Sequence, residues 1–271
     1  RAAYEADLIV PINRVKLHTD FVGPIQSGLC KMLVIGLGNH KGCSAVHEEA
    51  PEVFADAIEE TVRLILQKAP VGFGIAILEN AYDKTYAVEA VPAEHLVERE
   101  KELVQIAKGN MPYIMLDEAD VIVCGAIGKD ISGAGFDPNI LGRSSVLKQF
   151  VLHIPRYQRL VLCDVTPASH GNGIGVGLFD VITKKVAEQL DLESMYANAI
   201  ACNCLGDASV PCTVDDEETA IRVALKCCRN IDRDHPRIIR IQNTLHLGEI
   251  EVSEALLDAV RADSRMSLIE N

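Results

Sequence analysis

Short apolar runs alternate with longer amphipathic segments along most of this chain. Five of the runs have the length and composition of strands that are buried on both faces. They lie at residues 7–12, 72–78, 119–125, 160–165 and 237–242. Residues 85–91 alternate between apolar and polar positions, which predicts a strand at the edge of a sheet. Strands and helices that alternate along a chain favour a sheet with helices packed on it.

Four segments have the 3.6-residue periodicity of amphipathic helices. They lie at residues 51–68, 94–108, 178–190 and 217–228. The first has Pro51 at its start and Pro70 just after its end, and both positions are typical of helix boundaries. No internal repeat, low-complexity stretch or linker divides the sequence. We therefore expect residues 1–271 to form a single α/β domain, with a mostly parallel or mixed sheet and Gly-rich loops at the strand ends.

The composition argues against several classes of function. Hydrophobic residues make up 48% of the chain and charged residues 24%, which is ordinary for a soluble globular protein. The formal net charge of −13 disfavours binding to nucleic acids and to anionic membrane surfaces. No apolar run approaches the roughly 20 residues that a membrane-spanning helix needs. We therefore expect neither a nucleic acid nor a membrane as a partner.

The cysteines indicate a cytoplasmic protein. There are nine of them, an odd number, and they are scattered through apolar segments instead of forming a disulfide framework. Cys202, Cys204 and Cys212 are close enough in sequence to suggest a metal cluster. The chain contains no C-x-x-C pair, however, so small buried hydrophobic residues are the favoured interpretation.

The first residues, RAAYEAD, are typical of the end of a helix that leads into a buried strand, and they contain no signal peptide. We therefore expect an upstream N-terminal domain of the same protein.

Basic residues are concentrated near the start of this acidic chain. Between residues 9 and 47 there are four Lys or Arg and three His but one acidic residue, Asp20. A basic segment of this kind suits a small anionic ligand, although chance clustering explains it equally well.

Lys31 lies in an unusual place, because it interrupts the apolar segment LCKMLVI at residues 29–35. Loss of hydration favours the neutral amine, which is a nucleophile that can bond covalently to a cofactor. A lysine that extends its ammonium group to water along its aliphatic stem fits the segment as well. His18 and His47 flank Lys31, and imidazole is both a common metal ligand and a common general acid or base.

The stretch NRVKLHTDFVGPIQSGLCKMLVIGLGNHKG, with His47 after it, resembles the central motif of the lactate racemase-like family. Members are racemases and epimerases of 2-hydroxy acids, and the resemblance covers their C-terminal catalytic part. It implies a nickel-pincer nucleotide as cofactor, pyridinium-3-thioamide-5-thiocarboxylic acid mononucleotide with nickel. It further implies that Lys31 bonds covalently to the cofactor and that His47 completes the nickel coordination. His18 would be one of the two histidines that move the substrate proton.

The distance from His18 to Lys31 is a few residues longer than in the lactate racemases, which indicates a divergent subgroup. The resemblance implies an isomerase in which hydride leaves the substrate carbon for the pincer ring while a histidine removes the hydroxyl proton. The family's second catalytic histidine and its substrate-binding arginine lie in the N-terminal domain. The expected partners are a small anionic substrate and this upstream domain, and assembly as a homo-oligomer is left open.

Two Gly-rich loops follow predicted strands. The first, GAIGKDISGAGFDPNILGR, contains Lys129 and Arg143, which we consider candidates for binding the cofactor or a carboxylate; a solvated surface loop is the alternative. The second, TPASHGNGIGVG, precedes a predicted helix, as phosphate-binding turns do, and contains His170 as a candidate acid or base. A structural histidine in a tight turn explains His170 equally well.

These loops define the competing functions. The glycines at positions 171, 173, 175 and 177 do not fit the G-x-G-x-x-G pattern, so an oxidoreductase that binds NAD or a phosphate is the weaker alternative. A non-catalytic homologue that keeps the fold is a third interpretation.

Overall fold

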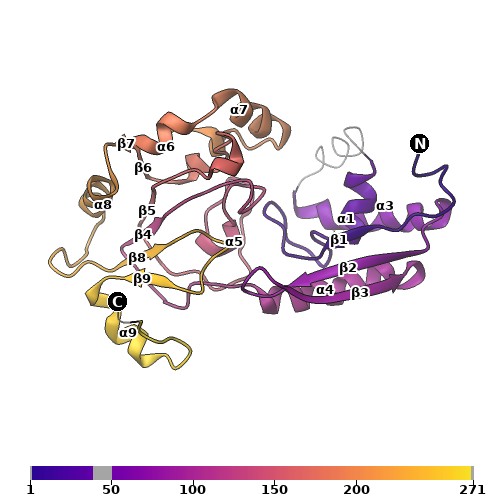
Figure 1. Cartoon of the computed structure of the whole chain (residues 1–271), viewed down its shortest axis with the longest axis horizontal. Coiled ribbons are helices and arrows are strands. Elements are labelled where there is room, and N and C mark those ends of the chain that lie inside the picture. The colour runs from indigo at the N-terminus through magenta and orange to yellow at the C-terminus, as the bar shows by residue number, and fades with distance from the viewer. Residues whose placement is uncertain (1, 39–50, 270–271) are drawn as a thin grey trace. The chain divides into compact units, whose positions relative to one another are not determined.

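The computed structural model of the chain describes residues 2–38 and 51–269. It divides into two compact units, Arg1–Pro112 (unit 1) and Tyr113–Asn271 (unit 2). The described strands form one three-stranded and one six-stranded sheet, and each sheet lies within one unit (Figure 1). The two units differ from the single domain predicted from the sequence, because apolar runs identify strands without telling which sheet each strand joins. The predicted α/β class is confirmed, since helices pack on mostly parallel and mixed sheets.

The sheet of unit 1 has the order β1-β2-β3. Its strands are β1 (Ile12–Arg14), β2 (Phe73–Glu79) and β3 (Thr85–Pro92). β1 runs parallel to β2, and β3 is antiparallel to β2 at the edge of the sheet, as its alternating pattern predicted. The strand expected at residues 7–12 begins only at Ile12, where it follows Pro11, a residue without the N–H that a sheet requires.

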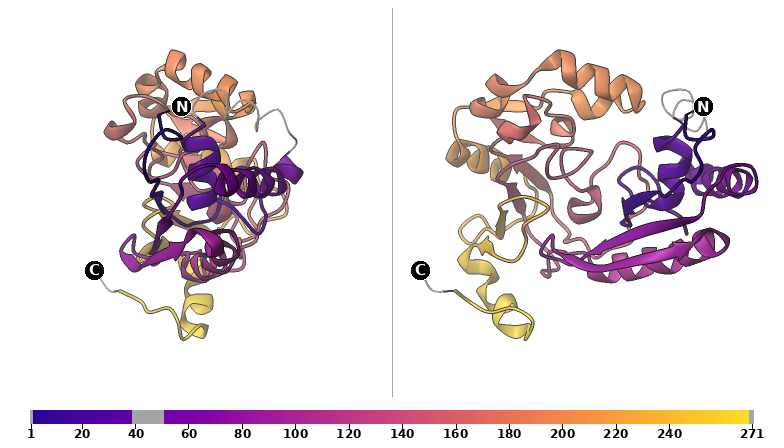
Figure 2. Two further views of the ribbon diagram at one scale, coloured as in Figure 1. Left: turned by 90° about the vertical axis from the view of Figure 1, so that its right-hand side faces the viewer. Right: turned by 45° about the vertical axis from the view of Figure 1, so that its right-hand side comes forward.

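Helices cover one face of this sheet. They are α1 (Leu29–Lys31), a π-helical turn (Met32–Gly36), α3 (Phe54–Lys68) and α4 (Leu96–Asn110), with 3₁₀ turns at Pro51–Val53 and Ala93–His95. Both long helices were predicted, and α1 packs against α3, α4, β1 and β2. α4 runs alongside the β2–β3 hairpin (Figure 2). Tyr86 and Val88 of β3 remain 60% and 63% exposed, so part of the sheet is left uncovered.

The sheet of unit 2 has the order β7-β6-β5-β4-β8-β9. Its strands are β4 (Val121–Cys124), β5 (Arg159–Leu162), β6 (Val181–Thr183), β7 (Cys212–Val214), β8 (Ile238–Ile241) and β9 (Ile250–Val252). All neighbours are parallel except β8 and β9. Every residue of β4 is 0% exposed, which explains why this strand is an uninterrupted apolar run in the sequence.

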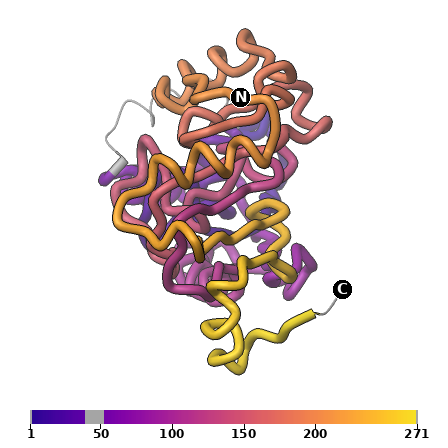
Figure 3. Tube along the Cα trace, turned by 90° about the vertical axis from the view of Figure 1, so that its left-hand side faces the viewer, coloured from indigo at the N-terminus to yellow at the C-terminus, as the bar shows by residue number. Residues whose placement is uncertain are grey.

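The helices of unit 2 are short. They are α5 (Pro138–Leu141), α6 (Lys184–Gln189), α7 (Leu192–Ala201), α8 (Glu217–Lys226) and α9 (Leu257–Ala262), with 3₁₀ turns at Pro167–Ser169, Val176–Leu178, Leu205–Ala208 and Glu254–Leu256. Ala220 and Ala224 of α8 are buried in one core cluster with the valines of β4, β5 and β6. The last segment, which contains α9 and is yellow in Figure 3, extends away from the sheet.

One predicted helix is wrong at its start. Residues 178–190 were expected to be helical throughout, but a 3₁₀ turn and then strand β6 precede α6. The β-branched residues of β6 fit a fully buried strand, and the Thr183 hydroxyl then accepts the Val186 N–H at the helix start. None of the described helices has the length and apolar character required to cross a membrane.

Candidate functional site

The candidate site in unit 1 begins with a closed loop. Lys16 and Ser27 exchange two backbone hydrogen bonds of 2.9 and 3.1 Å, which join the two ends of the segment between them. Inside it, buried Gln26 accepts the His18 N–H at 2.8 Å and donates to Gly23 O at 3.1 Å. These bonds return the chain to α1 directly after the loop. They explain how two residues thirteen positions apart, His18 and Lys31, become neighbours.

The structure brings His18 and Lys31 into contact. The Lys31 Nζ is in direct contact with His18 Nε2. His18 is only 6% exposed, and its ring packs against Phe21 with 4.3 Å between the ring centroids. Lys31 itself is half-buried. The amine is therefore directed at the imidazole at the edge of the core of unit 1.

A second hydrogen bond defines which nitrogen of His18 carries hydrogen. The Asp20 N–H donates to His18 Nδ1 at 3.0 Å, so Nδ1 is an acceptor and the neutral ring carries its hydrogen on Nε2. The contact with Lys31 is then an Nε2–H bond donated to Nζ. An ammonium group has no lone pair to accept it, whereas a neutral amine has one. This arrangement favours the neutral, nucleophilic form of Lys31.

The backbone also changes at Lys31. α1 ends there and continues into the π-helical turn, where Leu37 N donates to Met32 O at 2.9 Å. Short π-helical segments are rare and occur frequently at functional sites. Lys31 is thus held where the helix widens.

A buried carboxyl group lies behind this segment. Glu100 of α4 is 0% exposed, and its Oε2 accepts the Cys30 N–H at 3.0 Å. Burial raises the pKa of Glu100 to about 7, although the nearby N–H groups of Cys30 and Leu29 oppose the rise. Burial and the adjacent Glu100 carboxylate also raise the pKa of the Cys30 thiol, which disfavours its thiolate form.

The sequence analysis did not identify Glu100, although a signal is present. Leu96, Leu103 and Ala107 are buried along one stripe of α4, and Glu100 occupies the same stripe. An acidic residue on the apolar side of an amphipathic helix is uncommon, because an ionised carboxylate loses hydration there. The position of Glu100 on this stripe therefore marks it as a candidate functional residue.

The two Gly-rich loops of unit 2 lie side by side at the ends of β4 and β5. Thr166 N donates to Ile127 O at 2.8 Å, and Lys129 N donates to Ser169 Oγ at 2.8 Å. The predicted position of both loops at strand ends is therefore correct. Lys129 Nζ donates to Gly133 O at 2.6 Å, within its own loop.

The other candidates in unit 2 have structural surroundings. Arg143 forms an ion pair with Asp180 at 2.6 Å, donates to Leu178 O at 2.9 Å and lies over the ring of Tyr157. His170 is exposed and has a φ of 49°, which ends a 3₁₀ turn. The contacts of Arg143 favour a role in stabilising the fold. The backbone of His170 favours the structural role in a tight turn, which was the alternative to a role as acid or base.

The glycines of the second loop have a local explanation. A Cβ on Gly177 would lie 2.0 Å from Gly206 O, one on Gly175 2.3 Å from Ala134 O, and one on Gly171 2.8 Å from Gln189 O. Each glycine is required because the backbone of unit 2 itself approaches closely. A phosphate ligand is not needed to account for the pattern, which weakens the NAD or phosphate alternative.

The candidate nickel ligand His47 lies outside the described residues. Among the residues that are described, no three His, Cys, Asp or Glu side chains gather as a metal site. The contact of Lys31 with His18 fits the attachment of a cofactor to a neutral amine.

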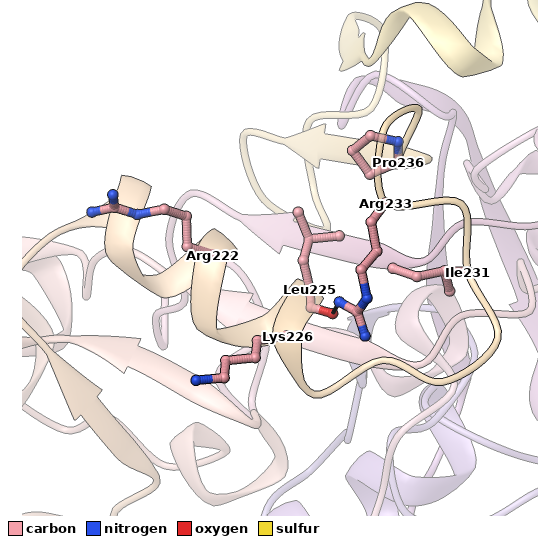
Figure 4. Close-up of a pocket in the computed structure, with 6 residues that line it drawn as sticks. All are labelled: Arg222, Leu225, Lys226, Ile231, Arg233 and Pro236. Carbon is pink, nitrogen blue, oxygen red and sulfur yellow. Dashed lines mark hydrogen bonds between the residues drawn. The ribbon is translucent and has the colours of Figure 1, made fainter.

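A pocket on the surface of unit 2 lacks a set of polar side chains that point to a common centre. It is lined by Arg222, Leu225, Lys226, Ile231, Arg233 and Pro236 (Figure 4). Arg222 and Lys226 point away from Arg233, whose guanidinium donates to Leu225 O and Cys228 O. The basic side chains therefore do not converge on a ligand.

The pKa of Glu100 predicts how stability varies with pH. Its value of about 7 in the folded chain exceeds the ordinary 4.5, so the folded state binds the proton more tightly than the unfolded state. The native state should lose stability as pH rises between these values, by roughly 3 kcal/mol, since one pKa unit is about 1.4 kcal/mol. We expect Glu100→Gln to remove this loss, as measured by urea unfolding at about pH 5 and about pH 8. Exposed Glu102, changed to Gln on the same helix, is the control, and equal pH dependence in both variants would contradict the assignment.

Comparisons with models of known protein families, with curated proteins and with solved structures gave no match. The sequence motif around Lys31 and the contacts of Lys31 and His18 are therefore the observations that bear on function.

Proposed function

We propose that this chain is the cofactor-carrying part of a racemase or epimerase of 2-hydroxy acids that depends on a nickel-pincer nucleotide. The observation that supports this most is the contact between Lys31 Nζ and His18 Nε2, combined with the Asp20 N–H on His18 Nδ1. Together they favour a neutral amine in the position where the motif implies covalent attachment. The motif itself supplies the other support.

Each residue then has a defined task. Lys31 provides the amine that bonds to the cofactor, and His47 provides an imidazole to the nickel. When bound, the nucleotide supplies an acceptor for the hydride that leaves the substrate carbon and returns to it. The substrate in this proposal is a small 2-hydroxy acid anion, and an upstream domain supplies the second proton-moving histidine.

His18 has two successive roles in this proposal. Before attachment, its Nε2–H is directed at the lone pair of Lys31. With the amine bound to the cofactor, that lone pair would be occupied, and the Nε2–H of His18 would then be able to orient an oxygen of the substrate. For the same ring to take the hydroxyl proton at Nε2, the Asp20 N–H must leave Nδ1, so that the ring hydrogen can move there.

The alternatives have less support. An oxidoreductase that binds NAD or a phosphate would use the loop around His170, and close backbone packing already accounts for three of the four glycines there. A non-catalytic homologue would keep the fold and leave Lys31 unmodified. The mass of the protein distinguishes that interpretation directly.

The proposed function predicts that the cofactor is attached at Lys31. In cells that make the cofactor and are supplied with nickel, the intact chain should gain the mass of the nucleotide. Lys31→Ala should abolish the gain while leaving the fold intact, because the side chain is only half-buried. Lys68→Ala, which removes an exposed lysine from the end of α3, is the matched control. An unmodified mass in cells shown to contain the cofactor would exclude the proposal.

The second prediction concerns nickel. His47→Ala should lower the nickel content of the purified holoprotein several-fold, because a neutral imidazole supplies a metal bond that the pincer alone does not replace. His170→Ala, which changes an exposed histidine in unit 2, should leave the content unchanged. Elemental analysis of the three proteins measures this. Equal nickel in His47→Ala and the parent would remove His47 from the metal site.

A further inference from the structure

Glu100 connects α4 to the segment that carries Lys31. Its Oε2 accepts the N–H of Cys30, the residue directly before Lys31, over a separation of 70 positions in the chain. The other oxygen, Oε1, is buried and has no hydrogen-bond partner among the described residues. The carboxyl group also lies against Gly28, where a Cβ would be 2.6 Å from Glu100 Cδ. Glycine at position 28 therefore makes room for this carboxyl group.

We propose that Glu100 is a positioning residue that holds the Lys31 amine against His18. This role rests on the proposed function of Lys31 as the cofactor-binding nucleophile. No substrate or cofactor needs to touch Glu100, because it acts through the backbone of residues 28–30.

The local structure needs such an anchor. α1 has three residues, and a helix that short has little stability of its own. It then continues into a π-helical turn, a geometry that is uncommon without support from outside. Asn13 Nδ2 holds Gly28 O at 3.0 Å on one side, and Glu100 holds the Cys30 N–H on another. The position of the next residue, Lys31, is set by these two contacts.

A buried carboxyl group such as that of Glu100 lowers the stability of the fold, so packing alone does not explain it. An apolar side chain at a 0% exposed position of α4 would avoid the loss of hydration that a carboxyl group suffers there. Its presence is explained by what it does: it accepts an N–H that an apolar side chain would leave unpaired, next to the proposed nucleophile Lys31.

The test measures the Lys31–His18 pair directly. The ¹⁵N signals of the His18 ring, assigned by their loss in His18→Asn, report the tautomer and the contact at Nε2. The rate at which acetic anhydride modifies Lys31 relative to exposed Lys68, measured by peptide mass spectrometry, reports the neutral amine. Both are measured on the folded, full chain, so a change in global stability alone does not alter them.

Glu100→Ala should shift the His18 Nε2 signal and lower the Lys31-to-Lys68 modification ratio several-fold. Glu100→Gln, which keeps an acceptor for the Cys30 N–H, should restore most of both. Glu102→Ala, on the exposed side of the same helix, should change neither. If folded Glu100→Ala protein keeps the parent His18 signals and the parent ratio, the positioning role is wrong.

Two further arms keep the outcomes separate. If Glu100→Ala does not fold, Gly28→Ala displaces the carboxyl group instead and should give the same changes, whereas Gly109→Ala, where a Cβ meets nothing within 4 Å, should not. If Lys31 of the parent is modified no faster than Lys68, Lys31 is not a neutral nucleophile and the proposed function is contradicted. The His18 signals of the Glu100 variants then decide the positioning role by themselves, in either direction.

Discussion

The hydrogen bond from the Asp20 N–H to His18 Nδ1 is the constraint on which the candidate chemistry depends. It leaves Nε2 as the ring nitrogen that carries hydrogen, and Nε2 is the atom that faces Lys31. The backbone pairing of Lys16 with Ser27 and the side chain of Gln26 keep the loop in the shape that this bond requires. One backbone N–H thus places the hydrogen of the neutral His18 ring on the nitrogen that faces Lys31.

The buried polar side chains of unit 1 are concentrated around this pair. His18, Gln26 and Glu100 are all less than a tenth exposed, and each makes a hydrogen bond that positions the loop or α1. Buried polar groups reduce stability unless they are paired, and proteins depart from apolar packing mainly where function requires it. The same side chains that would weaken a purely structural core therefore define the surroundings of Lys31.

Sequence patterns predicted the elements better than their assembly. The apolar run of β4 and the amphipathic stripes of α3 and α4 were recognisable because burial alone dictates them. The division into two units was not recognisable, since the sequence of an apolar strand does not tell which sheet the strand joins. Lys31 and His18 were both candidate site residues from one sequence stretch, and the structure brings them into contact. Glu100 was missed because its partner Cys30 is 70 positions away, and only the folded sheet and helices bring them together.

The Gly-rich loops of unit 2 illustrate why a glycine pattern is a weak indicator of a ligand. A phosphate loop needs glycine so that its N–H groups can approach an anion, but close packing of two backbone segments needs glycine for the same steric reason. Gly177 is such a case, because a Cβ there would lie 2.0 Å from Gly206 O. Lys129 would have to release Gly133 O before its ammonium group could bind a carboxylate. By contrast, Lys31 contacts an imidazole ring, a group that can accept or donate a proton near neutral pH. The two lysines therefore differ in their partners: a carbonyl oxygen has no proton to exchange with Lys129, whereas an imidazole can exchange one with Lys31.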